Sequence, residues 1–204
     1  MRCARRRPLI LGALTLLAVA CLGCRSSPPT QHHVLSPVIA TSSPGMSDTA
    51  LLCVVGVGPV SLPAYLDRPQ MVLRTAPDDI DVREFDQWGE PLRDGITRVV
   101  AVNVARLLPE SLVVVFPWRS TEKIRYQIVV EVAQMDGPAG GNVTLDARWR
   151  VLDASGKQIA ARAVHLSEPA GGGAATTASA MSRALGTLSR DIADWVRATE
   201  GWPR

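Results

Sequence analysis

The pattern of apolar and polar positions is clearest in the second half of the chain. Over residues 124–132, and again over 143–151, apolar side chains alternate with polar ones. A period of two is typical of strands that bury one face and leave the other in water. Turn sequences follow at 136–137 and 153–156, and a third apolar segment covers 158–166. The pattern predicts a meander of three antiparallel strands.

Two segments have a helical pattern instead. Apolar residues return every three or four positions over 90–108, where Pro91 suits the first turn of a helix and Pro109 ends it. A second helix is predicted over 174–199. Its apolar stripe consists of Met181, Leu185, Leu188, Ile192 and Trp195. A stripe of this kind stabilises a helix by packing on a sheet.

Shorter apolar runs predict further strands over 51–60, 70–75, 80–85 and 112–116. Gly56 and Gly58 in the first run lack the third glycine or the lysine of a phosphate loop, so we interpret them as a bulge or a close backbone approach. The predicted class is α+β: a two-layer sandwich with a mixed or antiparallel sheet, a C-terminal strand meander and two packed helices.

The first residues form a targeting segment. Arg2 and three further arginines precede an apolar run over 9–20, which is shorter than the roughly 20 residues of a membrane-spanning helix. Small residues and cysteines follow. Cys24, directly after Gly23, is typical of a bacterial lipobox, so we predict a signal peptide over 1–23 and acylation of Cys24.

Two alternatives concern this segment. Cys21 also follows small residues, and neither cysteine has a leucine three places before it. Cys24 is preferred because residues 25–30 have the composition of a tether. An ordinary signal peptide with leftover cysteines is the other alternative. Arg25, where an aspartate would be typical of retention in the inner membrane, favours sorting to the outer membrane of a Gram-negative envelope.

The predicted organisation has three parts. Residues 24–49 are rich in Ser, Pro and Thr and are predicted to be a tether that contains a short docking element over 32–35. A single domain is predicted over 50–200. Without residues 1–23 the chain has 18 basic and 19 acidic side chains, because four arginines leave with the signal. This near-neutral balance does not favour nucleic acid as a partner.

The reactive side chains do not form a recognisable catalytic set. Cys53 lies in an apolar run and is predicted to be buried, although a Cys24–Cys53 bridge would compete if Cys24 were free. His32 and His33 are adjacent in the tether, and His165 lies near a strand end. No serine stands in a G-x-S-x-G elbow, and the acidic run over 78–86 lacks a calcium-loop spacing. We predict no enzyme activity, no cofactor and no metal.

Four of the five tryptophans divide into two groups. Trp149 and Trp195 fall on apolar faces and are predicted to lie in the core. Trp88 and Trp118 lie beside turns, where they are either exposed anchors for a partner or lids over the core.

Two stretches resemble a known family. Residues 60–74 read VSLPAYLDRPQMVLR, and residues 88–92 read WGEPL just before the first helix. Together with the lipobox they resemble the ABC-type transport auxiliary lipoprotein family, the PqiC (YmbA) group, over most of residues 51–168. Paired aromatics near the tether of family members are replaced here by His32 and His33.

The resemblance implies a role and no reaction. Members are periplasmic lipoproteins that work with MCE-domain proteins, which form conduits for lipid between the two membranes. It implies docking of that conduit at the periplasmic face of the outer membrane, and assembly into a homo-oligomeric ring. The alternatives from other classes are an outer-membrane assembly or chaperone lipoprotein and a lipid-binding carrier.

A partner surface is predicted where the resemblance is strongest. Pro63 and Pro69 would stiffen the segment between them, so that Tyr65, Leu66 and Arg68 face a neighbour. The alternative is a structural crossover packed on its own sheet. The predicted partner-binding residues are Leu62, Pro63, Tyr65, Leu66, Asp67, Arg68, Pro69, Gln70 and Trp88.

Overall fold

The computed structural model describes residues 27–40, 53–119 and 123–200. Its larger sheet has five strands in the order β5-β2-β6-β7-β8, and β2 runs parallel to both of its neighbours. The strands β6, β7 and β8 are antiparallel, which confirms the predicted meander. The bounds are Cys53–Ser61 for β2, Ser111–Val115 for β5, Tyr126–Asp136 for β6, Asn142–Asp153 for β7 and Gln158–Pro169 for β8.

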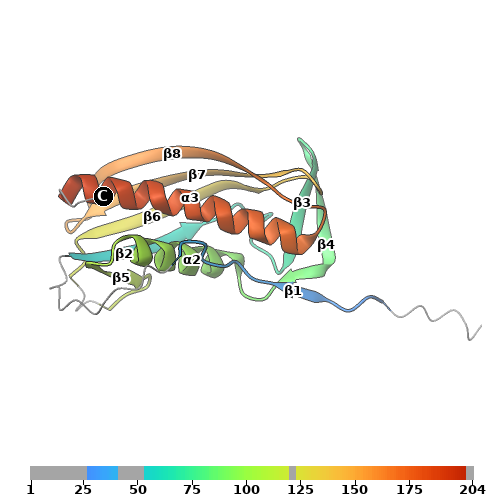
Figure 1. The fold of residues 1–204 in the computed structure, drawn as a ribbon, viewed down its shortest axis with the longest axis horizontal. Coiled ribbons are helices and arrows are strands. Elements are labelled where there is room, and N and C mark those ends of the chain that lie inside the picture. Colours follow the sequence, from blue (N-terminus) through green and yellow to red (C-terminus); the bar gives the residue numbers. More distant parts are fainter. Residues whose placement is uncertain (1–26, 41–52, 120–122, 201–204) are drawn as a thin grey trace, which may run out of the picture.

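Two helices, α2 (Leu92–Leu107) and α3 (Ala174–Glu200), lie side by side on one face of this sheet, as Figure 1 shows. The stripe predicted for the second helix faces the sheet, and Met181, Leu185, Leu188 and Ile192 are buried. Pro91 caps α2, and its carbonyl accepts the N–H groups of Asp94 and Gly95. The predicted two-layer α+β class is confirmed. No helix in the described part of the chain has the length and apolar character to cross a membrane.

A second, three-stranded sheet stands at one end of the first (Figure 1). The strands β3 (Gln70–Ala76) and β4 (Asp79–Trp88) form a hairpin, and β1 (Gln31–His33) adds to β4 in parallel. The sequence predicted β3 and β4 as short strands. It did not predict that they form a separate sheet, because strand pattern carries no information on which sheet a strand joins.

The two glycines of β2 confirm the bulge interpretation. The register of β2 against β6 shifts between Val57 and Val60. A Cβ atom at Gly56 would lie 2.8 Å from the ring of Trp118, and Gly58 has a φ of +117°, which side chains rarely allow. The chain therefore uses glycine here for a close approach and for a bend.

The predicted tether needs a correction. Residues 31–39 belong to the folded body, where Leu35 is 2% exposed and Ile39 is also buried. Two apolar residues on an extended segment make no periodic pattern, so the burial was not visible in the sequence. The signal segment, Cys21, Cys24 and residues 41–52 lie outside the described residues.

Candidate docking surface and anchor strap

The crossover segment, residues 62–70, joins β2 of the large sheet to β3 of the small one. Two short-range bonds fold it: the N–H of Leu66 donates to the carbonyl of Pro63 at 3.0 Å, and that of Arg68 donates to the carbonyl of Leu66 at 2.9 Å. The carbonyl of Pro69 accepts the N–H of Trp88 at 2.7 Å, which ties the segment to the end of β4. The crossover is therefore folded by internal backbone bonds and tied to β4 at its C-terminal end.

Tyr65 points inward from this segment to a buried carboxylate. Its hydroxyl donates to Asp136 at 2.7 Å, while Nε and Nη2 of Arg74 donate to the two carboxylate oxygens at 2.8 and 3.0 Å. Gln134 completes the set through its amide at 2.8 Å. We name these four residues the Asp136 cluster. It joins the crossover, β3 and the end of β6 at the junction of the two sheets.

The titration of the cluster reflects these bonds. Burial opposes the charged form of Asp136, but hydrogen bonds from Arg74, Tyr65 and Gln134 outweigh it and hold the pKa of this carboxyl below its ordinary value. Burial, and then the hydrogen bond to Asp136, raise the pKa of Tyr65 to about 12. The hydrogen bond to Asp136 also raises the pKa of Arg74. The cluster is a fixed ion pair with a phenol attached.

Burial corrects part of the predicted partner surface. Leu66 is 2% exposed and Trp88 is 7% exposed, so both side chains belong to the core and neither faces a partner. Trp88 is thus a lid over the core, and Tyr65 is half-buried and engaged with Asp136. The inward direction of Tyr65 and Leu66 follows from the turn at 63–66, where no regular period indicates the direction of a side chain. Trp88 is the last residue of β4.

The rest of the predicted surface stays accessible. We name it the crossover rim; it comprises Leu62, Pro63, Asp67, Arg68, Pro69 and Gln70, each exposed or partly exposed. Asp67 forms a surface ion pair with Arg93 of α2 at 2.5 Å. Exposed pairs of this kind contribute little to stability, at most about 1 kcal/mol. The rim is therefore accessible in the described structure.

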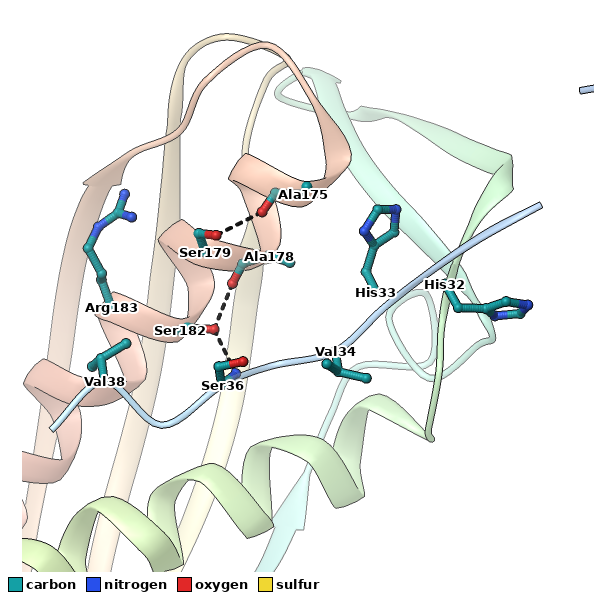
Figure 2. A pocket seen from close by; sticks show the side chains of 10 residues that line it. All are labelled: His32, His33, Val34, Ser36, Val38, Ala175, Ala178, Ser179, Ser182 and Arg183. Atoms are coloured by element: carbon teal, nitrogen blue, oxygen red, sulfur yellow. Dashed lines mark hydrogen bonds between the residues drawn. The ribbon is translucent and has the colours of Figure 1, made fainter. Parts of the chain in front are cut away.

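A second feature is a strap formed by residues 31–39, of which the sequence predicted only a docking element over 32–35. At the start of the strap, the carbonyl of His33 accepts the N–H of Gly89 at 2.8 Å. The imidazole ring of His33 contacts the carboxylate of Asp86 at 3.1 Å. Beyond β1 the strap runs between α2 and α3 (Figure 2). Because Gly89 follows Trp88, which is bonded to Pro69, the strap and the crossover rim lie at the same end of the molecule.

Four side-chain bonds hold the strap between the helices. From α2, Arg98 donates to the carbonyl of Leu35 at 2.9 Å, and Arg106 donates to that of Ile39 at 2.7 Å. Asn103 accepts the N–H of Ile39 at 3.3 Å, and Ser182 of α3 accepts that of Ser36 at 3.1 Å. The sequence signal for this binding was the spacing of Arg98, Asn103 and Arg106 along α2. The same spacing also fits a helix face exposed to solvent.

Beside the strap an open hollow of ≈ 350 Å³ remains (Figure 2). One wall is the strap from His32 to Val38, and the other is the first half of α3, with Ala175, Ala178 and Ser179. The strap is therefore open along the edge that faces the first half of α3, and it is covered where α2 and α3 bind its main chain.

The other predicted positions divide as follows. Cys53 is buried; burial raises the pKa of its thiol, and its sulfur lies 3.4 Å from the hydroxyl of Ser111. Trp149 lies in the core, with Trp195 packed edge-on against it at 6.3 Å. His165 is exposed and pairs with Asp146 at 2.5 Å. Among the described residues, no three His, Cys, Asp or Glu side chains are gathered to hold a metal ion.

Comparison with solved structures supports the fold. A crystal structure of an uncharacterized protein aligns with a TM-score of 0.68 at 19% identity, covering 83% of this chain and 99% of its own. Protein XCC0632 from Xanthomonas campestris, a DUF330 protein, aligns with a TM-score of 0.59 at 16% identity, covering 85% and 95%. At such identities the likeness concerns the fold alone.

No curated protein matches the sequence. The model of one family, ABC-type transport auxiliary lipoprotein component, matches residues 33–193.

Proposed function

Because the chain belongs to the ABC-type transport auxiliary lipoprotein family, we propose that it is a non-catalytic component of an MCE-type lipid transport system. In this proposal it docks the conduit protein at the periplasmic face of the outer membrane. The observation that carries the proposal is the family match over residues 33–193, which spans both sheets, both helices and most of the strap. The MCE partner and the outer membrane come from the resemblance of residues 60–74 and 88–92.

The proposed anchor is an acylated Cys24. Six residues separate Cys24 from Gln31, the first residue of β1. A fully extended chain of this length reaches about 25 Å. An acyl group on Cys24 would therefore keep Gln31 within that distance of the membrane surface, and the domain would be tethered through the strap, which is bonded to both helices. Several acyl chains are needed for a stable anchor.

The proposed docking surface is the crossover rim. It lies at the end of the molecule from which the strap continues toward Cys24, so an anchored domain would present the rim near the membrane. The backbone bonds within the crossover, the bond from Trp88 to Pro69 and the Asp136 cluster beneath it keep this surface in one shape, which lowers the entropy cost of binding. Copies assembled in a ring would present several rims around one conduit.

The anchor is tested by labelling with radioactive palmitate. Wild-type protein and the Cys21→Ser variant are expected to carry the label, and Cys24→Ser is expected to lose both the label and its firm attachment to membranes. Label that persists in Cys24→Ser and disappears in Cys21→Ser would move the anchor to Cys21. Absence of label from the wild type would refute an acylated anchor.

The docking surface is tested by charge reversal on the rim. Arg68→Glu and Asp67→Arg are expected to reduce co-purification with the MCE conduit protein. Ser155→Arg is the control, because Asp153 pairs with Tyr126 and so places the β7–β8 turn at the opposite end of β6 from Asp136. Equal recovery of the conduit with all three folded variants would exclude the rim. Recovery of an outer-membrane barrel in place of the conduit would favour an assembly factor.

A further inference from the structure

The strap is bound in the way that a protein binds a peptide. The four hydrogen bonds from α2 and α3 all go to its main chain, at Leu35, Ser36 and Ile39. Its two buried side chains, Leu35 and Ile39, are four residues apart, and the carbonyls of these same residues are bound by Arg98 and Arg106. Main-chain bonds supply affinity and side-chain pockets supply specificity in extended-peptide recognition.

The groove also fits the strap by shape. Gly186 of α3 lies under Val38, and a Cβ atom at Gly186 would overlap the Cγ2 atom of that valine. Gly89 likewise leaves room for Val34, whose Cγ1 atom lies 3.1 Å from the position of a Cβ. We name the surface formed by Arg98, Asn103 and Arg106 of α2, with Ser182 and Gly186 of α3, the α2–α3 groove.

The surroundings of the strap bear on whether it can leave its groove. The hollow of ≈ 350 Å³ leaves the strap uncovered along the edge that faces α3. Residues 41–52 connect it to Cys53, and covalent geometry gives that connection a maximum reach of about 45 Å. The strap is therefore able to leave its groove while β2 keeps its place in the sheet.

We propose that the strap is an exchangeable peptide ligand: the α2–α3 groove binds the strap of its own chain in an isolated protein and the strap of a neighbouring copy in a membrane assembly. Exchange of identical segments keeps every contact, so its cost is small. The proposal rests on one part of the proposed function, acylation near the strap. Anchoring places the straps of all copies in one plane and raises their local concentration.

A disulfide across the groove tests this directly. The Cβ of Val38 lies 3.8 Å from the position of a Cβ at Gly186, which is the mean Cβ–Cβ separation of a disulfide. The double variant Val38→Cys/Gly186→Cys is expected to close a bond within one chain. A double variant that stays reduced would show that the strap is not seated as described and would overturn the proposal.

Exchange is then measured with two differently tagged full-length copies expressed together. One carries Val38→Cys. The other carries Gly186→Cys with Val38→Ala, so that its own strap still fits over the new side chain. A disulfide-linked dimer of the two copies is the expected result. Unlinked chains, in conditions where the double variant closes its bond, would show that the strap stays in its own groove.

Chance collision in the membrane is excluded by a matched control. Ser155→Cys, in the exposed β7–β8 turn, replaces the Val38→Cys copy and is expected to give no linked dimer. Equal linking by both copies would overturn the proposal. The mass of the same samples reports acylation, and the link forms without a conduit protein, so failure of exchange is distinguished from failure of the proposed transport role.

Discussion

Replacement of Asp136 by alanine is the sharpest test of the junction between the two sheets. Asp136 has no solvent exposure and accepts four hydrogen bonds, two of them from Arg74. Removal of one partner from a buried ion pair typically costs 3–5 kcal/mol. The side chain of Arg74 is 24% exposed and also donates to the carbonyl of Pro77, so part of its charge stays solvated. We therefore expect a loss of about 3 kcal/mol, at the lower end of this range.

The assay is urea unfolding of the folded domain, with the free energy taken from the midpoint at unchanged slope. The control is Asp194→Ala, which removes an exposed carboxylate paired with Arg197 at 3.0 Å and is expected to change stability by less than about 1 kcal/mol. Equal losses of stability in the two variants would refute the reasoning. They would mean that leaving the partners of buried Asp136 without their carboxylate costs no more than removing an exposed carboxylate.

The same carboxylate predicts the direction of a pH effect. Its pKa is lower in the folded protein than the unfolded value of about 3.9. The stability that its charge contributes is therefore present above pH 4 and is lost as the pH falls through the folded pKa. The difference in stability between wild type and Asp136→Asn should stay constant at neutral pH and shrink in acid. A difference that grows in acid would contradict the sign.

Three further predictions concern the strap, the phenol and the thiol. Leu35→Ala should lower stability by about 2–4 kcal/mol in urea unfolding, because it leaves a cavity under the strap; Val34→Ala, at a side chain that is 54% exposed, should leave it nearly unchanged. In an ultraviolet titration the phenol of Tyr65 should ionise with a pKa of about 12. Its contribution to stability should decline as the pH rises from about 10, its ordinary pKa, to about 12. Tyr65→Phe should remove this alkaline decline. Cys53 should react with a thiol reagent only after denaturant is added, because its thiol is buried with a raised pKa; rapid labelling of the native protein would contradict its place in the core.

Periodic segments were predictable from the sequence because burial repeats along them. In the meander β6–β7–β8 and in the stripe of α3, apolar residues recur with periods of two and about 3.6, and this periodicity indicates which face is buried. Even the bulge at Gly56 and Gly58 was visible, since only a close approach or a bend explains two glycines in a buried strand.

The candidate site was predictable only in its location. Residues 62–70 were identified, but the sequence did not show that Tyr65 and Leu66 turn inward, because this stretch has no period. For Trp88 the sequence left open whether it is an exposed anchor or a lid over the core. The direction of Tyr65 depends on Asp136, which is 71 residues away along the chain. A bond between positions so far apart leaves no local pattern.

By itself the amino-acid sequence determined the two helices, the meander and the family resemblance, because each is a local pattern or a motif. The signal peptide and the acylated Cys24 stay predictions of the sequence. The tertiary structure alone decided that the docking element predicted over 32–35 is part of a longer strap, residues 31–39, bound between the two helices. Leu35 and Ile39 become core residues only when α2 and α3 lie side by side and Arg98, Asn103, Arg106 and Ser182 meet across them. An extended segment has no internal hydrogen bonds, so its place is set by the groove that binds it.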